Sequence, residues 1–403
     1  MNTSPAIYLD NNATTAMDPA VIDAMVEVMR IGPINPSSPH HFGRTARQHV
    51  ERAIDRIGQV IHCRLDAPGG SRLIITSGGT EANNLAITGC ADRGPILVSG
   101  VEHASVLAMV DELDDPSRPV IHWEVDGDGR VRLDQLDAVL AGDDPPTMVI
   151  AMSANNETGV LQPIGSIARR CHRHGAHFHV DATQSVGKSE DSASDPLGLN
   201  LDGELSTGLG SLECSGIRSL AFAAHKFHGP AGVGGLWIDA GVKVRPMMRG
   251  GEQQLDSRPG TESVALIVAM ATALERSVAA APASVPRMRR LRDDLEGRLV
   301  HDAAPVVVHG RSAPRLPNTT CVAFPGVDRQ SLLMALDMIG VACSSTSACS
   351  SGSSPPSHVL AAMGIDDRLR QSTIRLAVSR FSTESEIDQA ADAICRCVKR
   401  LRG

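Results

Sequence analysis

The chain has 403 residues, of which 42% are hydrophobic and 2% aromatic, and its formal net charge is −8. This length exceeds what one hydrophobic core usually serves, so we expect two domains with aliphatic cores. The negative charge and the absence of a long basic run argue against nucleic acid or a membrane surface as a partner, which leaves a small molecule or a protein.

The first fifteen residues, MNTSPAIYLDNNATT, contain no basic segment followed by an apolar one, so no signal peptide is predicted. The longest apolar stretch, 264–274, is too short to cross a bilayer and fits a buried helix. Nine cysteines without a Cys-x-x-Cys pair predict reduced thiols. We therefore expect a cytoplasmic protein in which one or more thiols are chemically active.

Four apolar runs each end in a polar cluster that leads into a helix-like segment, and a fifth run ends at His225 and Lys226. This repeat of strand, turn and helix predicts an α/β fold with a mostly parallel sheet, whose ligand sites lie beyond the carboxyl ends of the strands. The polar residues that follow the runs should therefore share one edge of the sheet: Thr80, His103, Asn156, Asp181 and Lys226.

The sequence pattern changes after about residue 263. A helix-like stretch covers 263–300, and the small polar residues of 342–358 predict an exposed loop. The prediction is a large domain over 17–262 and a smaller α+β domain, made of 1–16 and 263–403, that carries this loop.

The segment SGGTEANN at 77–84 has the features of a phosphate site. Its two glycines let the backbone approach an anion, Thr80 offers a hydroxyl, and the following helix offers free N–H groups. Because any turn from strand to helix can carry Gly and Thr, the motif alone leaves an ordinary turn open.

Asp181 and Lys226 fit the chemistry of pyridoxal 5'-phosphate. Asp181 follows a half-apolar strand, where a protonated pyridine nitrogen would stabilise its carboxylate, although an aspartate there also fits a helix N-cap. A desolvated lysine has a lowered pKa and forms a Schiff base with an aldehyde, whereas the ordinary interpretation of Lys226 is a surface lysine at a strand end. A phosphate site, an aspartate and a lysine, each after its own strand, make the set that this cofactor needs.

Histidines and cysteines supply further candidates. His103 could stack on a flat ring, although a single histidine is more often structural. The cluster CHRHGAHFHVD at 171–181 lacks a familiar metal-ligand spacing, so no metal site is predicted. Cys349, in the turn-rich stretch SSTSACSSG, fits an exposed and reactive thiol, with Cys343 as its competitor.

Taken together, these motifs resemble those of the pyridoxal-phosphate-dependent cysteine desulfurases in the class V aminotransferase superfamily. The resemblance implies the aspartate-aminotransferase-like fold, with a seven-stranded, mostly parallel sheet in the large domain. The matching stretches follow the family's order over essentially the whole chain: YLDNNATT (8–15), NPSSPHHFGR (35–44), TSGGTEANN (76–84), EHASVL (102–107), ANNETG (154–159), HVDATQSVGK (179–188), HKFHGPAGVGG (225–235), GTES (260–263), SACSSGS (347–353), PSHVL (356–360) and TIRLAVSR (373–380).

The resemblance also implies a role for each matching residue. Lys226 would be the Schiff-base lysine, Cys349 the nucleophile that accepts sulfur, and His103 a ring that stacks on the cofactor and assists proton transfer. Asn156, also counted among the cofactor contacts, and Arg375 would bind the substrate carboxylate. The remaining implied contacts are Asp181 with the pyridinium nitrogen, Gln184 with the ring hydroxyl, and Gly79, Thr80 and His225 with the phosphate, joined by Thr261 from the other subunit of a homodimer.

The implied reaction converts L-cysteine to L-alanine and leaves sulfur on Cys349 as a persulfide. A sulfur-acceptor or scaffold protein would take this sulfur for iron–sulfur clusters or other products. The alternatives are a selenocysteine lyase or another class V lyase and, from a different class, a non-catalytic sulfur-carrier or assembly paralogue. Three features depart from the family pattern, which usually has Ser at Ala223, Gly at Thr346 and a shorter stretch in place of 189–218.

Overall fold

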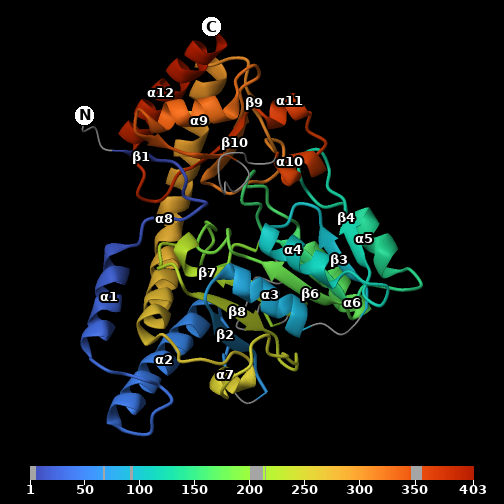
Figure 1. The fold of residues 1–403 in the computed structure, drawn as a ribbon, viewed down its shortest axis with the longest axis vertical. Coiled ribbons are helices and arrows are strands. Elements are labelled where there is room, and N and C mark those ends of the chain that lie inside the picture. Colours follow the sequence, from blue (N-terminus) through green and yellow to red (C-terminus); the bar gives the residue numbers. More distant parts are fainter. Residues whose placement is uncertain (1–5, 67–68, 91–93, 200–211, 214, 346–355) are drawn as a thin grey trace.

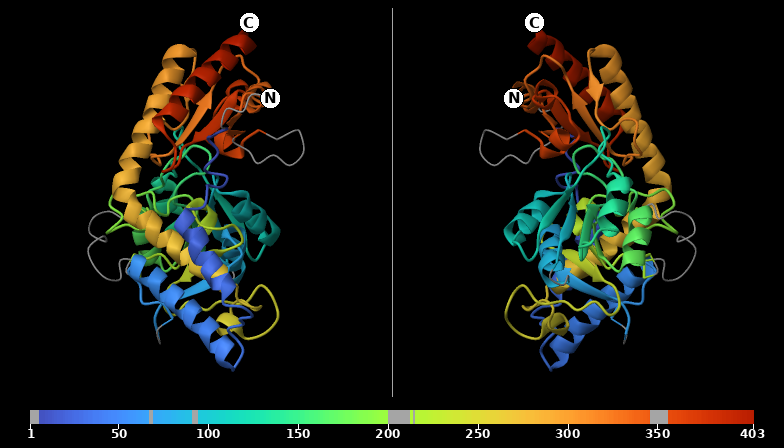
Figure 2. Two further views of the ribbon diagram at one scale, coloured as in Figure 1. Left: turned by 90° about the vertical axis from the view of Figure 1, so that its left-hand side faces the viewer. Right: turned by 90° about the vertical axis from the view of Figure 1, so that its right-hand side faces the viewer.

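The computed structural model divides into a larger and a smaller part that share one long helix. Figure 1 shows a sheet with helices around it in the lower part, a smaller upper part, and α8 (Val264–Asp302) passing from one to the other. The side views of Figure 2 show α8 along one side of the molecule. The structure describes residues 6–66, 69–90, 94–199, 212–213, 215–345 and 356–403.

The larger part is built on a seven-stranded sheet with the strand order β2-β8-β7-β6-β5-β3-β4. β8 runs antiparallel to both of its neighbours and the other pairs are parallel, which confirms the predicted mostly parallel sheet. Helices cover both faces, so most strands are apolar along their whole length. The strands are β2 (Arg72–Thr76), β3 (Ile96–Ser99), β4 (Val120–Trp123), β5 (Met148–Met152), β6 (His177–Asp181), β7 (Ser219–Ala223) and β8 (Gly234–Ile238).

Local signals in the sequence start several helices of this part. The first helix follows Asp18, whose carboxylate accepts from the Ala20 N–H, and has Pro19 at its first position. The helices are α1 (Pro19–Arg30), α2 (His41–Val60), α3 (Gly79–Gly89), α4 (Ala104–Leu113), α5 (Leu133–Leu140), α6 (Ile164–His174), the short 3-10 turn η1 (Ala224–Lys226) and α7 (Gln253–Asp256).

The smaller part joins the two ends of the chain. A four-stranded antiparallel sheet has the order β12-β13-β10-β9, and β1 pairs in parallel with β11, so the N-terminal segment packs with the C-terminal part. The elements are β1 (Ile7–Tyr8), β9 (Val307–Val308), β10 (Thr319–Ala323), α9 (Arg329–Asp337), β11 (Val341–Ala342), β12 (Ser344–Ser345), α10 (His358–Ala362), α11 (Asp367–Arg370), β13 (Thr373–Ala377) and α12 (Glu384–Arg402).

The long helix α8 contributes to two large apolar clusters. Ile267 and Leu274 in its first half pack into the core of the larger part, and Val285 and Leu295 in its second half pack into that of the smaller part. By length and composition alone α8 could cross a membrane, whereas the stretch 264–274 by itself is too short. Half of its most apolar window is buried inside the protein, as in a core helix. The domain boundary at residue 263 stays a prediction.

Gly234 provides a test of the close approach between β8 and the turn before α3. A Cβ at Gly234 would lie 2.6 Å from the Phe222 carbonyl oxygen and 2.8 Å from the Gly78 Cα, and neither backbone atom can turn aside. We predict that Gly234→Ala lowers the free energy of unfolding by about 1–3 kcal/mol. Gly297→Ala, exposed on α8 with nothing within 4 Å, should raise it by roughly 0.5–1 kcal/mol. Denaturant unfolding of both variants measures this, and equal effects would contradict it.

Candidate functional site

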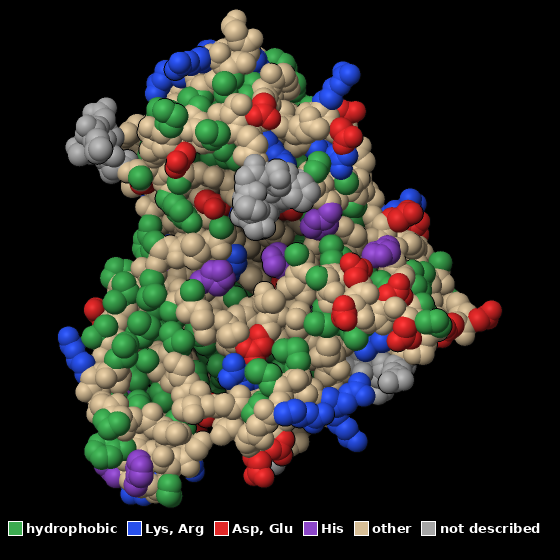
Figure 3. Space-filling model, in the orientation of Figure 1, with side chains coloured by type: hydrophobic (Ala, Val, Ile, Leu, Met, Phe, Trp, Pro, Cys, Tyr) green, Lys and Arg blue, Asp and Glu red, His purple; other side chains and the backbone are tan. Residues whose placement is uncertain are grey.

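A cavity at the carboxyl edge of the large sheet brings together most of the predicted site residues. Its empty space is about 1060 Å³, open solvent included, and Ser344, Ser345 and Arg375 line it from the smaller part. Figure 3 shows a hollow between the two parts, with histidine side chains around it. Nine predicted residues line the cavity: Gly79, Thr80, His103, Asn156, Asp181, Gln184, His225, Lys226 and Arg375.

Two predicted residues are not in this group. Thr261 is exposed and does not line the cavity of its own chain. Cys349 lies outside the described residues, as does Thr346. Their predicted roles stay predictions.

Lys226 reaches the cavity from η1, directly after β7. Its Nζ donates to the carbonyl oxygens of Asn12, at 2.6 Å, and Ala13, at 2.7 Å. Burial, and then the positive charge of Arg375, lower the pKa of Lys226 to about 8. Part of the amine is therefore neutral near physiological pH, which a nucleophilic lysine requires.

Asp181, at the end of β6, is 5% exposed. Its Oδ1 accepts from the Thr183 backbone N–H at 2.9 Å, and its Oδ2 accepts from Asn83 Nδ2 at 2.8 Å. The Thr183 contact forms a local turn, and the described residues 182–199 contain no helix, so Asp181 is not the helix N-cap that its position also fitted. The Asn83 contact comes from α3. The carboxylate is thus held at the cavity wall by a donor on each oxygen.

His103 follows β3 and caps the start of α4. Its Nδ1 accepts from the Ser105 backbone N–H at 3.1 Å, which places the ring proton of the neutral form on Nε2. Burial lowers the pKa of His103, so the neutral ring is favoured.

The other end of the cavity is a place for an anion. Within the described part of the chain α3 begins at Gly79 without a side-chain cap, so its first N–H groups can donate to an anion. A Cβ at Gly79 would lie 3.0 Å from Thr183 Oγ1 and 3.7 Å from the Ala223 Cβ. Thr183 Oγ1 is buried and has no hydrogen-bond partner among the described residues. Burial lowers the pKa of His225 to about 4, so this ring is neutral and would contact an anion as a polar group without a charge.

Arg375, in β13, is 5% exposed and fixed from two sides. Its Nη1 donates to the Asn156 carbonyl oxygen at 2.9 Å, and its Nη2 forms an ion pair with Asp10 Oδ1 at 2.7 Å. Within the described part of the chain its Nε has no partner, which leaves a donor for a substrate carboxylate.

These groups fit pyridoxal 5'-phosphate. The free N-terminus of α3 and the unpartnered Thr183 hydroxyl suit its phosphate, the Asp181 carboxylate suits its pyridine nitrogen, and the Lys226 amine suits its aldehyde. A buried hydroxyl without a partner is costly, so a ligand that accepts or donates there would be stabilised.

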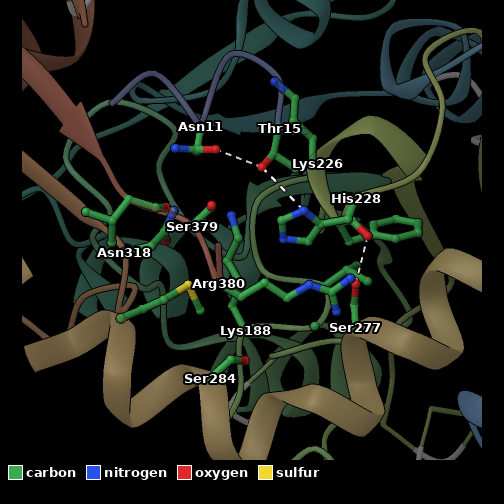
Figure 4. Close-up of a pocket in the computed structure, with 15 residues that line it drawn as sticks. Asn11, Thr15, Lys188, Lys226, His228, Ser277, Ser284, Asn318, Ser379 and Arg380 are labelled. Atoms are coloured by element: carbon green, nitrogen blue, oxygen red, sulfur yellow. Dashed lines mark hydrogen bonds between the residues drawn. The ribbon is translucent and has the colours of Figure 1, made fainter. Parts of the chain in front are cut away.

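A second cavity, of about 380 Å³, lies on the other side of Lys226. Figure 4 shows that its polar side chains face one another: Thr15 Oγ1 donates to Asn11 Oδ1 at 2.8 Å, and Ser277 Oγ donates to the Phe227 carbonyl oxygen at 2.7 Å. Lys188 lines this cavity, and burial followed by the charge of Lys226 lowers the pKa of Lys188 to about 7. Most of its polar atoms are already paired, so we do not assign it a ligand.

Two histidines of the histidine-rich stretch form hydrogen bonds within the large sheet. His177 and His179, on the same face of β6, both hydrogen-bond to Ser219 Oγ, at 2.8 and 2.9 Å. In the part of the chain that the structure describes, no three His, Cys, Asp or Glu side chains form a group that could hold a metal ion.

Sequence reasoning did not identify four residues of the site. Asp10 and Asn12 lie in the quoted motif YLDNNATT, and Thr183 lies in HVDATQSVGK, so the motifs contained them without indicating a role. Asn83 also lies within a quoted motif. Their contacts with Arg375, Lys226, α3 and Asp181 join segments far apart in the chain, which local patterns do not specify.

Three comparisons place the chain among known proteins. The family model described as aminotransferase class-V matches residues 7–195 and 210–390. The chain is 36% identical over 400 residues to a cysteine desulfurase of Trichormus azollae, and 38% identical over 397 residues to one of Klebsiella pneumoniae, covering 98% of this chain and 94% of each relative. The X-ray structure of a NifS-like protein from Rickettsia africae ESF-5 superposes with a TM-score of 0.83 at 28% identity, covering 98% of this chain and 99% of that one.

The reactivity of Lys226 should follow its lowered pKa. In the protein without cofactor, acetic anhydride should acetylate Lys226 half-maximally near pH 8, because only the neutral amine reacts and the ammonium form dominates below that pH. Arg375→Met removes a neighbouring positive charge, so the midpoint should move to higher pH. Mass spectrometry measures this, with the exposed Lys399 as internal reference. A midpoint that Arg375→Met leaves unchanged would contradict the role of that charge.

Proposed function

Because the chain belongs to the class-V aminotransferases and, within them, to the cysteine desulfurases, we propose that it converts L-cysteine to L-alanine and carries the sulfur on Cys349. Enzymes of this family depend on pyridoxal 5'-phosphate. The observation that carries the proposal is that Lys226, Asp181, the start of α3 and Arg375 line the same cavity.

The residues of the cavity divide the binding of the cofactor among them. The N-terminus of α3 and Thr183 would hold its phosphate, Asp181 its ring nitrogen, and Lys226 Nζ its aldehyde carbon. When bound, the cofactor withdraws electrons from the α-carbon of the substrate, the carbon that bears the amine. The neutral Lys226 Nζ can accept the proton of the substrate α-carbon, and His103 offers a proton on Nε2.

Arg375 and Asn156 would bind the substrate carboxylate. The ion pair with Asp10 fixes the guanidinium plane, and the contact with the Asn156 backbone places the Asn156 side chain beside it at the cavity wall. The free Nε of Arg375 then gives the carboxylate a donor with a fixed direction.

We assign sulfur transfer to Cys349. The bond between the substrate β-carbon and its sulfur breaks, a bond between this sulfur and Cys349 Sγ forms, and the products are L-alanine and a persulfide, without an external oxidant. Two observations support the assignment. Ser344 and Ser345, the last described residues before 346–355, line the cavity, and burial raises the pKa of the Cys343 thiol to about 12.

The proposal includes partners and a compartment. Thr261 is exposed on its own chain, which suits a contribution to the cavity of a second copy in a homodimer. A sulfur-acceptor or scaffold protein would take the persulfide for iron–sulfur cluster assembly or other products. The seven described cysteines are free, which suits a reducing cytoplasm.

The test of the function is release of alanine from L-cysteine by the purified, cofactor-loaded protein. Borohydride reduction should leave the cofactor on the Lys226 peptide, although the chain has three other lysines, including the nearby Lys188. Lys226→Ala should abolish alanine release. Absence of alanine from the wild type, or label on Lys188, would refute the proposal.

Replacing Cys343 and Cys349 one at a time separates their roles. We predict that Cys349→Ala keeps the cofactor and its absorbance but loses persulfide formation, because the accepting thiol is gone, whereas Cys343→Ala retains activity. Trypsin digestion and mass spectrometry locate the extra sulfur atom. Undiminished alanine formation by Cys349→Ala would instead favour a lyase, which does not need this thiol.

Thr183 and Ala223 should set the affinity for the phosphate of the cofactor. A hydrogen bond to a charged group contributes about 1.5–3 kcal/mol, so Thr183→Val should weaken cofactor binding roughly ten- to a hundredfold. Ala223→Ser adds a hydroxyl close to the start of α3 and should strengthen it. Equilibrium dialysis in the presence of cysteine measures both affinities. If neither variant changes the affinity, these two side chains do not contact the phosphate.

A further inference from the structure

A chain of side-chain hydrogen bonds runs through the interior of the larger part and ends at Asp181. It begins with His177 Nε2 and Ser219 Oγ, 2.8 Å apart, and continues from Ser219 Oγ to His179 Nδ1 at 2.9 Å. His179 Nε2 lies 3.1 Å from Asn83 Oδ1, and Asn83 Nδ2 lies 2.8 Å from Asp181 Oδ2. The chain crosses from β7 and β6 to α3 and back to the end of β6.

The Asp181 carboxylate, which can only accept, decides where each proton in this chain of hydrogen bonds lies. The Asp181 carboxylate accepts, so Asn83 presents its NH₂ group there and its Oδ1 faces His179, whose Nε2 must carry the proton. His179 Nδ1 is then bare and accepts from the Ser219 hydroxyl, which in turn accepts from His177 Nε2–H. Burial lowers the pKa of His177 to about 3 and that of His179 to about 4, in agreement with two neutral rings.

Asn83 also connects to His103. Its Nδ2 lies 3.0 Å from Ser105 Oγ, and Ser105 Oγ lies 2.9 Å from His103 Nδ1. Because the Ser105 backbone N–H also donates to this Nδ1, the His103 proton stays on Nε2. The two hydrogens of one buried amide, 1% exposed, therefore serve two groups of the cavity.

We propose that Asn83 is a positioning residue that sets the orientation of Asp181 and His103 together, and that His179 fixes the direction of the Asn83 amide. The inference rests on the proposed function, because that function assigns Asp181 to the ring nitrogen of the cofactor and His103 to proton transfer. It gives the histidines of β6 a task in the site, as neutral donors and acceptors. Both hydrogens of the Asn83 amide are hydrogen-bonded, so neither the Asp181 carboxylate nor the His103 ring can rotate without breaking a buried hydrogen bond.

The first test is cofactor affinity without substrate. Asn83→Leu keeps the size of the side chain and removes both donations, so pyridoxal 5'-phosphate titrated into the apoprotein should bind ten- to a hundredfold more weakly. Asn84→Leu is the matched control. Asn84 lies next to Asn83 in α3, and its Nδ2 donates to the Ser105 carbonyl oxygen at 2.7 Å and does not bond to Asp181. Its affinity should stay within threefold of wild type, and equal losses in the two variants would overturn the proposal.

The second test reads the protons directly and needs neither cofactor nor turnover. In ¹⁵N-histidine spectra of the apoprotein at pH 7, His179 and His103 should both be neutral with the proton on Nε2. A charged His179, or one protonated on Nδ1, would overturn the proposal. His179→Gln can still donate to Asn83 and accept from Ser219, so it should bind the cofactor with wild-type affinity. His179→Phe can do neither and should bind it about tenfold more weakly. This pair of variants tests the proposal even if Asn83→Leu does not fold.

The two tests separate this inference from the proposed function. Cofactor binding with these differences, in a protein that releases no alanine from cysteine, would support the role of Asn83 and refute the activity. If the wild type releases alanine and Asn83→Leu binds the cofactor as tightly as the wild type, the activity is supported and the role of Asn83 is refuted.

Discussion

Two backbone carbonyl oxygens, those of Asn12 and Ala13, hold the Lys226 amine at the end of β7, and the site depends on this contact. They belong to the segment after β1, which pairs with the C-terminal part. The Asn12 side chain donates to Thr319 Oγ1 and accepts from Asn318 Nδ2 at the start of β10. One short segment therefore ties the lysine to the smaller core, so the amine is positioned only once both cores have formed.

The charges of the site explain why it favours an anionic cofactor. Lys226, Lys188 and Arg375 lie close enough that each lysine pKa is lowered, first by burial and then by neighbouring positive charge. Asp10 is paired with Arg375, and the histidine His225 is neutral, so it does not add to the repulsion. A bound phosphate and a substrate carboxylate would relieve this repulsion, and binding to the folded state alone would stabilise the protein.

The sequence predicted the parts of this structure that depend on local pattern. Apolar runs that end in Thr76, Ser99, Met152, Asp181 and Ala223 predicted the sheet, and because these strands share a carboxyl edge, eight of the nine predicted residues that line the cavity meet there. The ninth, Arg375, comes from the sheet of the smaller part. The role of α8 in both cores could not be predicted, since apolar periodicity identifies the buried face of a helix and leaves its partner open.

The contacts that hold the site residues were also beyond sequence reasoning. Asp10 and Arg375 are 365 positions apart and Asn83 and Asp181 are 98 apart, so their pairing depends on the assembled fold. Asn83 carries no signal by its type, because an asparagine early in a helix is as compatible with an exposed position as with a buried amide that donates twice. That the Thr183 hydroxyl has no hydrogen-bond partner among the described residues likewise follows only from the folded structure.

Burial also decides which thiols can react. A thiolate is the nucleophile, and desolvation raises the pKa of every described cysteine thiol, to about 12 for Cys63, Cys90, Cys171 and Cys343. A protein that carries a persulfide must keep the transferable sulfur from its own thiols, because any thiolate within reach attacks an S–S bond. In this fold the seven described cysteines are buried or partly buried and their thiols remain protonated, so burial disfavours each of them as a sulfur acceptor, in agreement with the proposal for Cys349.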